Sequence, residues 1–483
     1  MRYKSPPPPS KRMEHIRKSI VQAQVLCTEH DPLVPSRIIE ENEYSGTCFR
    51  VDNALFPFGD KVLFLTNFHV CDNADDRLVH LRTAGMGKNA LTGYVEAVVP
   101  QLDCAVISLT DTHEKWFLDD PQEWIDRIAI APLRTTRITT KTQKVSTIGF
   151  PHGLEEQLSS GWLAGRGSDD MDMLQLNISI NSGNSGGPLF DKSGKVIGIC
   201  TATLNETEAI AFAVPIYSVL NYFEKFYEQP YGRFPQWGLD LMPMTDAFAD
   251  QFGITRVGAV VRDVEDGCCR NLISNGDVLH SITSGSQTWE LDRFGLIHDN
   301  TRGSKITMNN TEFLMRLTPG DIHLDITRKK TAKTITVTPT PIDYKVTENY
   351  KEWNPVNTYR LGPITMQTLS KTLITSESMH PHHVVRLVEI LKQTKCMKEL
   401  VIITHVEPRS YVNNLEVDAE FNIVHRIGRR KVKDMDHCIS LLKEVEKRWE
   451  SGEQKRICIG TNNGDIWLTL GLLGMKRKRN MAS

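Results

Sequence analysis

One serine stands between glycines in residues 183–189, which read Gly-Asn-Ser-Gly-Gly-Pro-Leu. The apolar residues 196–199 follow closely and predict a strand that would hold this loop rigid. Such a loop can combine a nucleophilic hydroxyl, that of Ser185, with backbone N–H groups that converge on a developing oxyanion. A Gly/Ser-rich turn before a strand is commonly no more than a turn. The chemical interpretation therefore depends on partners elsewhere in the chain.

Two upstream residues are candidates to activate this serine, because a hydroxyl nucleophile needs a base and the base needs an orienting group. His69 follows the apolar run 62–65, at a point where a strand would pass into a loop. Asp103 stands immediately before the apolar residues 104–107, although an isolated aspartate there is commonly a turn residue. The chain order His, Asp, Ser is that of chymotrypsin-like proteases and not that of subtilisins or α/β-hydrolases.

Five ordered segments of the chain resemble the HtrA/Deg serine proteases. Three of them surround His69, Asp103 and Ser185, and the other two are residues 148–154 (Ile-Gly-Phe-Pro-His-Gly-Leu) and 211–215 (Ala-Phe-Ala-Val-Pro). Five blocks in the same order are far harder to obtain by accident than one motif. The resemblance implies a mainly-β protein whose first domain is a chymotrypsin-like double β-barrel.

The resemblance also implies roles for individual residues. Ser185 would attack the scissile carbonyl, His69 would take its proton, and Asp103 would hold the imidazole tautomer. The N–H groups of Gly183 and Ser185 would form the oxyanion hole. Asn184 replaces the aspartate that digestive proteases pair with a newly cut N-terminus, so we expect control by loop ordering instead of N-terminal cleavage.

Substrate preference is suggested by the residues that precede the nucleophile. Trypsin-like enzymes carry an aspartate six residues before the serine, and this chain has Ser179 there, followed by the apolar Ile180. The resemblance assigns both residues to the S1 pocket and implies cleavage after residues such as Val, Ala, Ile or Leu. One methylene changes binding by only about 1–3 kcal/mol, so we expect loose selectivity. Residues 164–173 and 202–208 occupy the positions of the family's activation loops.

Composition limits the remaining classes of function. The chain has 483 residues, 40% of them hydrophobic, and a net charge of −2, which predicts about three globular domains and does not favour nucleic acid as a partner. No apolar run approaches the roughly 20 residues that span a bilayer. No phosphate-binding loop with its lysine is present, so we expect an ATP-independent protein. The adjacent Cys268-Cys269 and the histidine cluster at residues 380–383 lack metal-site spacing, so we expect no metal, and we expect no other cofactor. An N-terminus without an apolar segment, together with ten cysteines that fit reduced thiols, predicts an intracellular protein, cytoplasmic or nuclear.

The sequence predicts further domains around the protease domain, which we assign to residues 15–228. Residues 1–14 form a proline-rich tail, and residues 236–342 resemble a PDZ domain. Its carboxylate loop would be Trp237, Gly238 and Leu239, beside a sheet edge where an extended peptide can add as a strand. The alternative is a β-rich domain with no binding function.

The last part of the chain is less regular. Residues 358–472 resemble a second, PDZ-like α+β domain, in which Leu361-Gly362-Pro363-Ile364 would be the carboxylate loop. Pro363 removes one N–H group from that loop, so we expect this domain to pack within the protein and not to bind C-termini. Residues 473–483 form a basic tail, which fits either a solvated terminus or a nuclear import signal.

The sequence as a whole predicts an ATP-independent serine endopeptidase of HtrA/Deg type. By resemblance, its substrates would be unfolded or misfolded proteins or peptides, and its regulators would be PDZ-bound peptides. The family also implies a homo-oligomer, a trimer or a multiple of it. The alternative is a peptide-binding chaperone or adaptor that uses its PDZ domains and keeps a largely inactive protease domain as a scaffold.

Overall fold

The structure is a computed structural model that describes residues 11–473 outside a set of gaps. The gaps are residues 84, 88, 111–120, 139–141, 151–155, 167–172, 179, 181–182, 204–210, 266, 300–303, 340–355, 371–372, 375–380, 383, 386, 388–399 and 416–418. The chain divides into two compact units, residues 1–27 with 43–342 and residues 28–42 with 343–483. The hairpin tip at residues 28–42 therefore groups with the C-terminal part of the chain.

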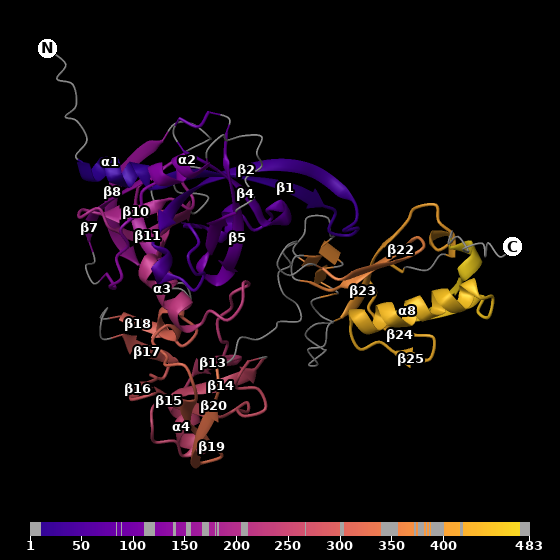
Figure 1. Cartoon of the computed structure of the whole chain (residues 1–483). Coiled ribbons are helices and arrows are strands. Elements are labelled where there is room, and N and C mark those ends of the chain that lie inside the picture. Colours follow the sequence, from indigo (N-terminus) through magenta and orange to yellow (C-terminus); the bar gives the residue numbers. More distant parts are fainter. Residues whose placement is uncertain are drawn as a thin grey trace. The chain divides into compact units, whose positions relative to one another are not determined.

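The first six strands form a closed barrel in the order β1-β2-β3-β6-β5-β4 (Figure 1). These strands are β1 (Ile20–His30), β2 (Ile38–Val51), β3 (Leu63–Thr66), β4 (Leu78–Arg82), β5 (Leu91–Val99) and β6 (Cys104–Leu109). Helix α1 (Lys11–Lys18) precedes them, and the 3₁₀ helices η1 (Asn53–Leu55), η2 (Phe68–Val70), η3 (Asp75–Arg77) and η4 (Pro100–Leu102) lie in their connections. Residues of β5 alternate between buried and half-buried over its first part, which is the period-2 pattern of a barrel wall.

The next six strands close a second barrel in the order β10-β11-β12-β9-β8-β7. They are β7 (Gln143–Gly149), β8 (Gln157–Arg166), β9 (Leu174–Asn177), β10 (Pro188–Asp191), β11 (Val196–Thr203) and β12 (Ala211–Pro215), preceded by helix α2 (Pro121–Arg127). Aliphatic residues fill the interior, among them Val145, Leu163, Leu174, Leu176, Leu189 and Ile197. The chymotrypsin-like double β-barrel that the sequence predicts is therefore confirmed.

Helix α3 (Ile216–Lys225) follows the second barrel and packs on β11 and β12. Phe223 on this helix meets Phe56 and Phe58 of the first barrel edge-on, with ring centroids 5.3 and 5.8 Å apart. Edge-to-face pairs of this kind contribute about 0.5–1.5 kcal/mol beyond their buried area. The helix thus joins the two barrels through a shared aromatic cluster.

The rest of the first unit is a sheet in the order β13-β14-β15-β19-β20, with β16 paired to β15. Its strands are β13 (Leu239–Pro243), β14 (Ala259–Val264), β15 (Val278–Ser284), β16 (Gln287–Glu290), β19 (Ile322–Arg328) and β20 (Thr331–Val337). A separate hairpin of β17 (Leu296–Asp299) and β18 (Ser304–Thr307) and the helices α4 (Asp246–Phe252) and α5 (Thr311–Leu314) complete it. Strand β13 lies at one edge of this sheet.

The C-terminal unit contains two small sheets, ordered β21-β22-β23 and β25-β24-β26-β27. The strands are β21 (Thr358–Leu361), β22 (Ile364–Thr368), β23 (Val401–Val406), β24 (Val424–Ile427), β25 (Arg430–Lys431), β26 (Arg456–Thr461) and β27 (Gly464–Thr469). Helix α8 (Met435–Glu450) buries Leu441, Leu442 and Val445 in a core shared with both sheets, and the short helices η6 (Asn413–Leu415) and η7 (Leu470–Leu472) lie in connections. The unit therefore has a hydrophobic core of its own.

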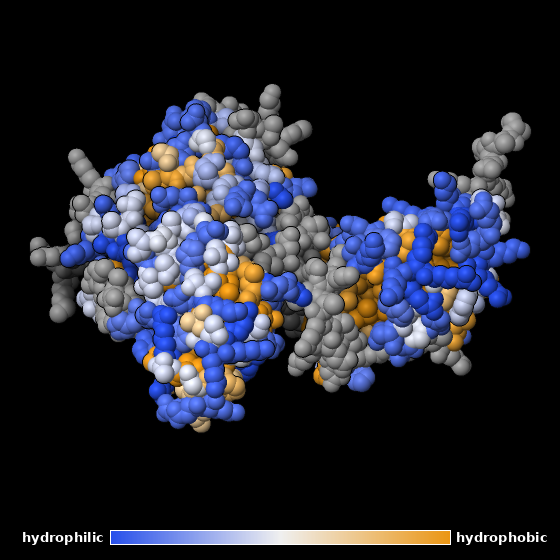
Figure 2. Space-filling view, turned by 90° about the horizontal axis from the view of Figure 1, so that it is seen from below, coloured by the Kyte–Doolittle hydropathy of each residue, from blue (hydrophilic) through white to orange (hydrophobic). Residues whose placement is uncertain are grey.

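The surface is mainly hydrophilic on the face drawn in Figure 2, where apolar residues form separate patches. Large apolar side chains that are more than half exposed include Trp162 on β8, Phe294 before β17 and Trp467 on β27. In the part of the chain that the structure describes, no helix combines the length and the apolar character needed to cross a membrane.

Candidate active site

His69 and Asp103 are joined by three hydrogen bonds. His69 lies in η2, directly after β3, and Asp103 lies between η4 and β6, and the two meet because β3 and β6 are neighbours in the first barrel. The ring Nδ1 of His69 is 2.8 Å from Asp103 Oδ2 and 3.0 Å from Oδ1, and the backbone N–H of His69 donates to Oδ1 at 3.0 Å. A carboxylate in this place favours the tautomer with its proton on Nδ1, which leaves Nε2 available as a base.

Asp103 ends the 3₁₀ helix η4 in a left-handed backbone conformation. Its φ of 44° lies in the left-handed region, which few non-glycine residues adopt. The hydroxyl of Thr201, on β11 of the second barrel, donates to Asp103 Oδ2. Hydrogen bonds from both barrels therefore fix the carboxylate of Asp103 in its orientation toward His69.

The pKa of His69 reflects opposing effects. Burial alone would lower it, but the hydrogen bond to Asp103 and the negative charges of Asp103 and Asp72 raise the pKa of His69 above its ordinary value. Burial in turn raises the pKa of Asp72 to about 6. A raised imidazole pKa stabilises the imidazolium that forms when the base accepts a proton.

Thr47 on β2 holds the loop that carries Ser185. The backbone N–H of Thr47 donates to the carbonyl of Ser185 at 2.8 Å, and its hydroxyl donates to the carbonyl of Gly183 at 2.6 Å. Thr47 is fully buried, so the carbonyl of Gly183 would lose its donor if the hydroxyl were removed. The first barrel thus positions a loop of the second.

Asn67 links the serine loop to Asp103. Its Oδ1 accepts a hydrogen bond from the N–H of Gly186 at 2.6 Å, and its Nδ2 donates to the carbonyl of Asp103 at 2.9 Å. Gly186 has φ +83°, and a Cβ there would lie 2.1 Å from the carbonyl oxygen of Thr47. Only glycine fits this close approach between the two barrels.

The backbone of the serine loop leaves two donors unused. Within the described residues, the N–H groups of Gly183 and Ser185 donate to no protein acceptor, and Gly183 has φ +99°. Nor does any hydrogen bond in the described part of the chain join the hydroxyl of Ser185 to His69. Such catalytic contacts are often long without substrate and shorten when it binds.

Asn184 precedes the nucleophile and is almost fully buried, with 1% of its surface exposed. Its side-chain Oδ1 has no hydrogen-bond partner among the described residues and lies against Gly149, where a Cβ would approach it to 2.5 Å. A negative charge at this position would be desolvated without compensation. Position 184 therefore suits the neutral amide of an asparagine, and the charged carboxylate of an aspartate there would disturb the site.

The residues assigned to the S1 pocket and to the activation loops are described only in part. Ser179 lies outside the described residues, as do residues 167–172 and 204–208 of the two predicted loops. Ile180 is 7% exposed and packs with Ile178, Leu189 and Cys200 in the core of the second barrel. Its contact with substrate remains a prediction.

The backbone carbonyls of the predicted carboxylate loop before β13 accept hydrogen bonds that fix the loop in place. The N–H groups of Cys269 and Glu265 donate to the carbonyls of Trp237 and Gly238, at 3.2 and 2.9 Å. The indole of Trp237 is buried and donates to the carbonyl of Met308 at 2.9 Å. Trp237 is therefore an anchor of the core, while Leu239 begins the edge strand β13.

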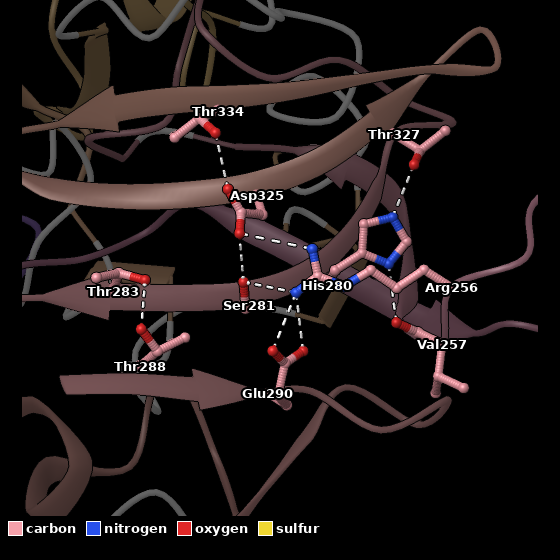
Figure 3. A network of polar contacts seen from close by, with 10 residues as sticks. All are labelled: Arg256, Val257, His280, Ser281, Thr283, Thr288, Glu290, Asp325, Thr327 and Thr334. Atoms are coloured by element: carbon pink, nitrogen blue, oxygen red, sulfur yellow. Dashed lines mark hydrogen bonds and ion pairs between the residues drawn. The ribbon is translucent and has the colours of Figure 1, made fainter.

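A network of charged and polar side chains covers β15, β16, β19 and β20 of the same domain (Figure 3). Arg256 pairs with Glu290 at 2.9 Å and with Asp325 at 3.5 Å, and Ser281 donates to Asp325 at 2.9 Å. His280 is nearly buried, and its two ring nitrogens lie 2.8 Å from the carbonyl of Val257 and from the hydroxyl of Thr327. These contacts tie neighbouring strands together, and we assign the network a structural role.

Comparisons with known proteins agree with this geometry. The family model described as a trypsin-like peptidase domain matches residues 46–199, which include His69, Asp103 and Ser185. Residues 46–199 are a trypsin-like peptidase domain. Over 148 residues, the chain is 32% identical to a probable periplasmic serine endoprotease, DegP-like, from Bartonella henselae, covering 29% of each protein.

Other relatives extend the similarity. The chain is 27% identical over 229 residues to a DegP-like endoprotease of Halomonas elongata, covering 45% of this chain and 44% of that one. It is 25% identical over 271 residues to the chloroplastic Protease Do-like 1 of Arabidopsis thaliana, covering 50% and 57%. A solved HtrA-type protease, AlgW with a decapeptide, has a TM-score of 0.48 at 20% identity and covers 69% of this chain and 98% of that one. The chain spans between 29% and 57% of the length of the three sequence relatives. The names of these relatives agree with the resemblance to HtrA/Deg serine proteases that the sequence indicates.

One prediction is contradicted by these comparisons. The sequence predicts a cytoplasmic or nuclear protein, whereas the DegP-like relatives are named periplasmic. The prediction rests on an N-terminus without an apolar segment and on cysteine content, and unpaired cysteines fit several compartments because they need not be oxidised in any of them.

Three residues that shape the site, Thr47, Asn67 and Thr201, were not predicted from the sequence. Asn67 lies two residues before His69, inside one of the segments that carry the family resemblance, so its position was a usable signal. Thr47 and Thr201 act across distances of 138 and 98 residues, to Ser185 and Asp103, and no local pattern marks them.

Proposed function

We propose that the chain is an ATP-independent serine endopeptidase with Ser185 as nucleophile, His69 as general base and Asp103 as its orienting carboxylate. The observation that carries the proposal is the arrangement in which Asn67 joins the Ser185 loop to Asp103 while Asp103 binds His69. This arrangement supports hydrolysis of an amide bond because Asp103 orients the imidazole of His69 and Asn67 holds the serine loop against the barrel that carries this base.

In the proposed reaction, Ser185 Oγ attacks the scissile carbonyl carbon and its proton passes to Nε2 of His69. The carbonyl oxygen becomes an oxyanion, which the N–H groups of Gly183 and Ser185 stabilise because both are free of other acceptors among the described residues. One such donor typically contributes about 3–4 kcal/mol to transition-state stabilisation. The imidazolium then protonates the leaving amine, and water releases the acyl group by the reverse steps.

Covalent labelling tests the proposed nucleophile. We expect a fluorophosphonate probe to label the wild-type chain, and Ser185→Ala to abolish both labelling and cleavage of unfolded casein while the protein stays folded. Ser160→Ala, an exposed serine on β8, is the matched control and should behave like the wild type. Casein cleavage at the wild-type rate by Ser185→Ala would disprove the assignment, and absence of labelling in every condition would favour the adaptor alternative.

We further propose unfolded or misfolded proteins as substrates, cleaved after small or medium uncharged residues. The supporting observations are the apolar Ile180 and the relatives named serine endoproteases. Sequencing the products of a peptide library would test this preference, and products that mainly follow Arg or Lys would contradict it.

We propose that the PDZ-like domain of residues 236–342 regulates the site. The support is Glu312, which follows directly on the start of α5, is 3% exposed and pairs with Arg137 and Arg166 from the second-barrel region. Arg166 ends β8 and so precedes residues 167–172, within the predicted activation loop. An HtrA-like oligomer and peptide binding along the edge strand β13 complete the proposal.

A further inference from the structure

The sheet β21-β22-β23 of the C-terminal unit is buried on both faces. Ile364, Met366, Val401 and Ile403 face the core beneath α8. On the alternate positions, Gln367 and Thr404 are 1% and 0% exposed although their side chains are polar. A buried polar group without a hydrogen-bond partner is destabilising, so the partners of these two side chains define what the second face can bind.

Both side chains bind the hairpin tip between β1 and β2, which belongs to the same compact unit. The amide Nε2 of Gln367 donates to the carbonyl of Pro32 at 2.7 Å, and the hydroxyl of Thr404 donates to the carbonyl of Leu33 at 2.7 Å. The side chain of Leu33 packs against a small cluster on this face that includes Leu369 and Ile402. Two adjacent carbonyls and one apolar side chain therefore form a single point of attachment.

The hairpin tip has internal hydrogen bonds that do not involve the C-terminal sheet. Asp31 accepts hydrogen bonds from the N–H of Leu33 at 2.9 Å and from the guanidinium of Arg37 at 3.0 Å, and its own N–H donates to the carbonyl of Arg37 at 2.9 Å. Pro32 and Pro35 restrict the backbone on both sides of Leu33. A preorganised loop loses little conformational entropy on docking, which is what a specific ligand requires.

The position beside β22, where a peptide could add as a strand, is already filled. Strand β21 pairs antiparallel with β22 from Thr358↔Gln367 to Leu361↔Ile364, on the edge opposite β23. Tyr359 on β21 donates to Glu446 of α8 at 2.6 Å. A peptide that added as a strand beside β22 would have to displace β21, whereas β13 of the first PDZ-like domain has no such neighbour in the described sheet.

We propose that the C-terminal domain is a receptor for an internal proline-flanked turn, the Asp31–Arg37 hairpin tip of its own chain, and that it does not take peptides by strand addition. The recognition elements are the Gln367 and Thr404 donors and the apolar cluster that includes Leu369 and Ile402. The proposal is independent of peptidase activity, because none of these residues belongs to the proposed catalytic site.

Hydrogen–deuterium exchange of the full-length protein tests the contact. Leu33→Asp places a charge in the apolar cluster, and Ser36→Asp places the same charge on an exposed residue of the same turn. We expect Leu33→Asp to raise amide exchange in residues 28–42 and 364–374 at least tenfold, and Ser36→Asp to leave it unchanged. Because the tip belongs to the same chain, protection in the wild type should not depend on protein concentration.

Peptide binding provides a second measurement that does not depend on the stability of one variant. A fluorescent peptide of residues 28–42 should bind the Leu33→Asp protein at least tenfold more tightly than the wild type, whose site is occupied. Adding Thr404→Val to Leu33→Asp should weaken that binding, and adding Thr404→Ser, which keeps the hydroxyl, should preserve it. Equal exchange in Leu33→Asp and Ser36→Asp, protection that grows with concentration, or equal peptide binding by all variants would overturn the proposal.

Discussion

At the scale of single residues, the proposed chemistry depends on hydrogen bonds that cross between the barrels. The blocks around His69, Asp103 and Ser185 were recognisable in the sequence because each is a short local motif. Thr47 and Thr201 were not, because their partners lie far along the chain and a threonine in a strand has no distinguishing context. The residues that react are therefore predictable from sequence, and the residues that position them require the fold.

Replacing Thr47 tests this positioning role. Thr47→Val has nearly the same shape but leaves the carbonyl of Gly183 without its donor, so we expect kcat/KM on a peptide substrate to fall about tenfold. Thr47→Ser keeps the hydroxyl and should retain most of the activity. Steady-state kinetics and thermal unfolding of both variants would distinguish a local effect from unfolding, and equal rates for both would contradict the role.

The pH dependence of activity tests the charge around His69. Activity requires the neutral imidazole, and the negative charge of Asp72 helps to raise the pKa of His69. Asp72→Asn should therefore lower that pKa and move the acidic limb of the kcat/KM profile to lower pH. Asp60→Asn, an exposed aspartate of the same barrel, should leave the profile in place, and a shift of the limb to higher pH in Asp72→Asn would contradict the assignment.

At the scale of elements, the sequence predicted long regular segments better than connections. The apolar residues 196–199, predicted as a strand, lie in β11, and the apolar run 62–65 before His69 overlaps β3. The segment of residues 361–364 was expected as a carboxylate loop. In the structure, Leu361 pairs with Ile364, and Gly362 and Pro363 form the two-residue turn of the β21–β22 hairpin. Gly362 has φ +57°, which suits the first central residue of such a turn, and the flanking strands decide between the two interpretations.

The buried His280 in the sheet of the first PDZ-like domain should make its stability depend on pH. Burial, with the nearby charge of Arg256 as a smaller contribution, lowers the pKa of His280 below its ordinary value. The unfolded chain then binds a proton near pH 6.5 that the folded one does not, so stability is complete above that pH and is lost as the pH falls. His280→Gln should reduce the loss of Tm between pH 7.5 and pH 5.5, whereas His298→Gln, an exposed histidine of the same domain, should not. An unchanged loss in His280→Gln would contradict this explanation.

At the scale of the whole molecule, each of the two units has its own core, and the first joins the two barrels to the sheet domain of residues 236–342. Glu312 makes charged contacts between these two parts, with Arg137 and Arg166 on one side and Arg316 at 2.8 Å on the other. Charge composition alone could not reveal this cluster, because its members are spread over 180 residues and the chain is almost neutral.

Neutralising Glu312 tests whether this contact couples the two parts. Glu312→Gln leaves the arginines without their buried counter-charge, so we expect the free energy of unfolding to fall by up to about 3 kcal/mol. We also expect any stimulation of cleavage by a peptide bound at β13 to be lost. Asp246→Asn removes an exposed ion pair with Arg293 and should change stability by less than about 1 kcal/mol. If a peptide bound at β13 still stimulated cleavage by Glu312→Gln as it does in the wild type, the Glu312 contact would not be part of the regulation.

The hydrogen bonds that join Thr47 and Asn67 to the serine loop have a consequence for dissected forms of the protein. The nucleophile belongs to one half of the protease domain, while its clamp and its base belong to the other. Two fragments divided between the barrels should each be inert, and mixing them should restore turnover only as far as they reassociate. Catalysis would then report directly on fragment complementation.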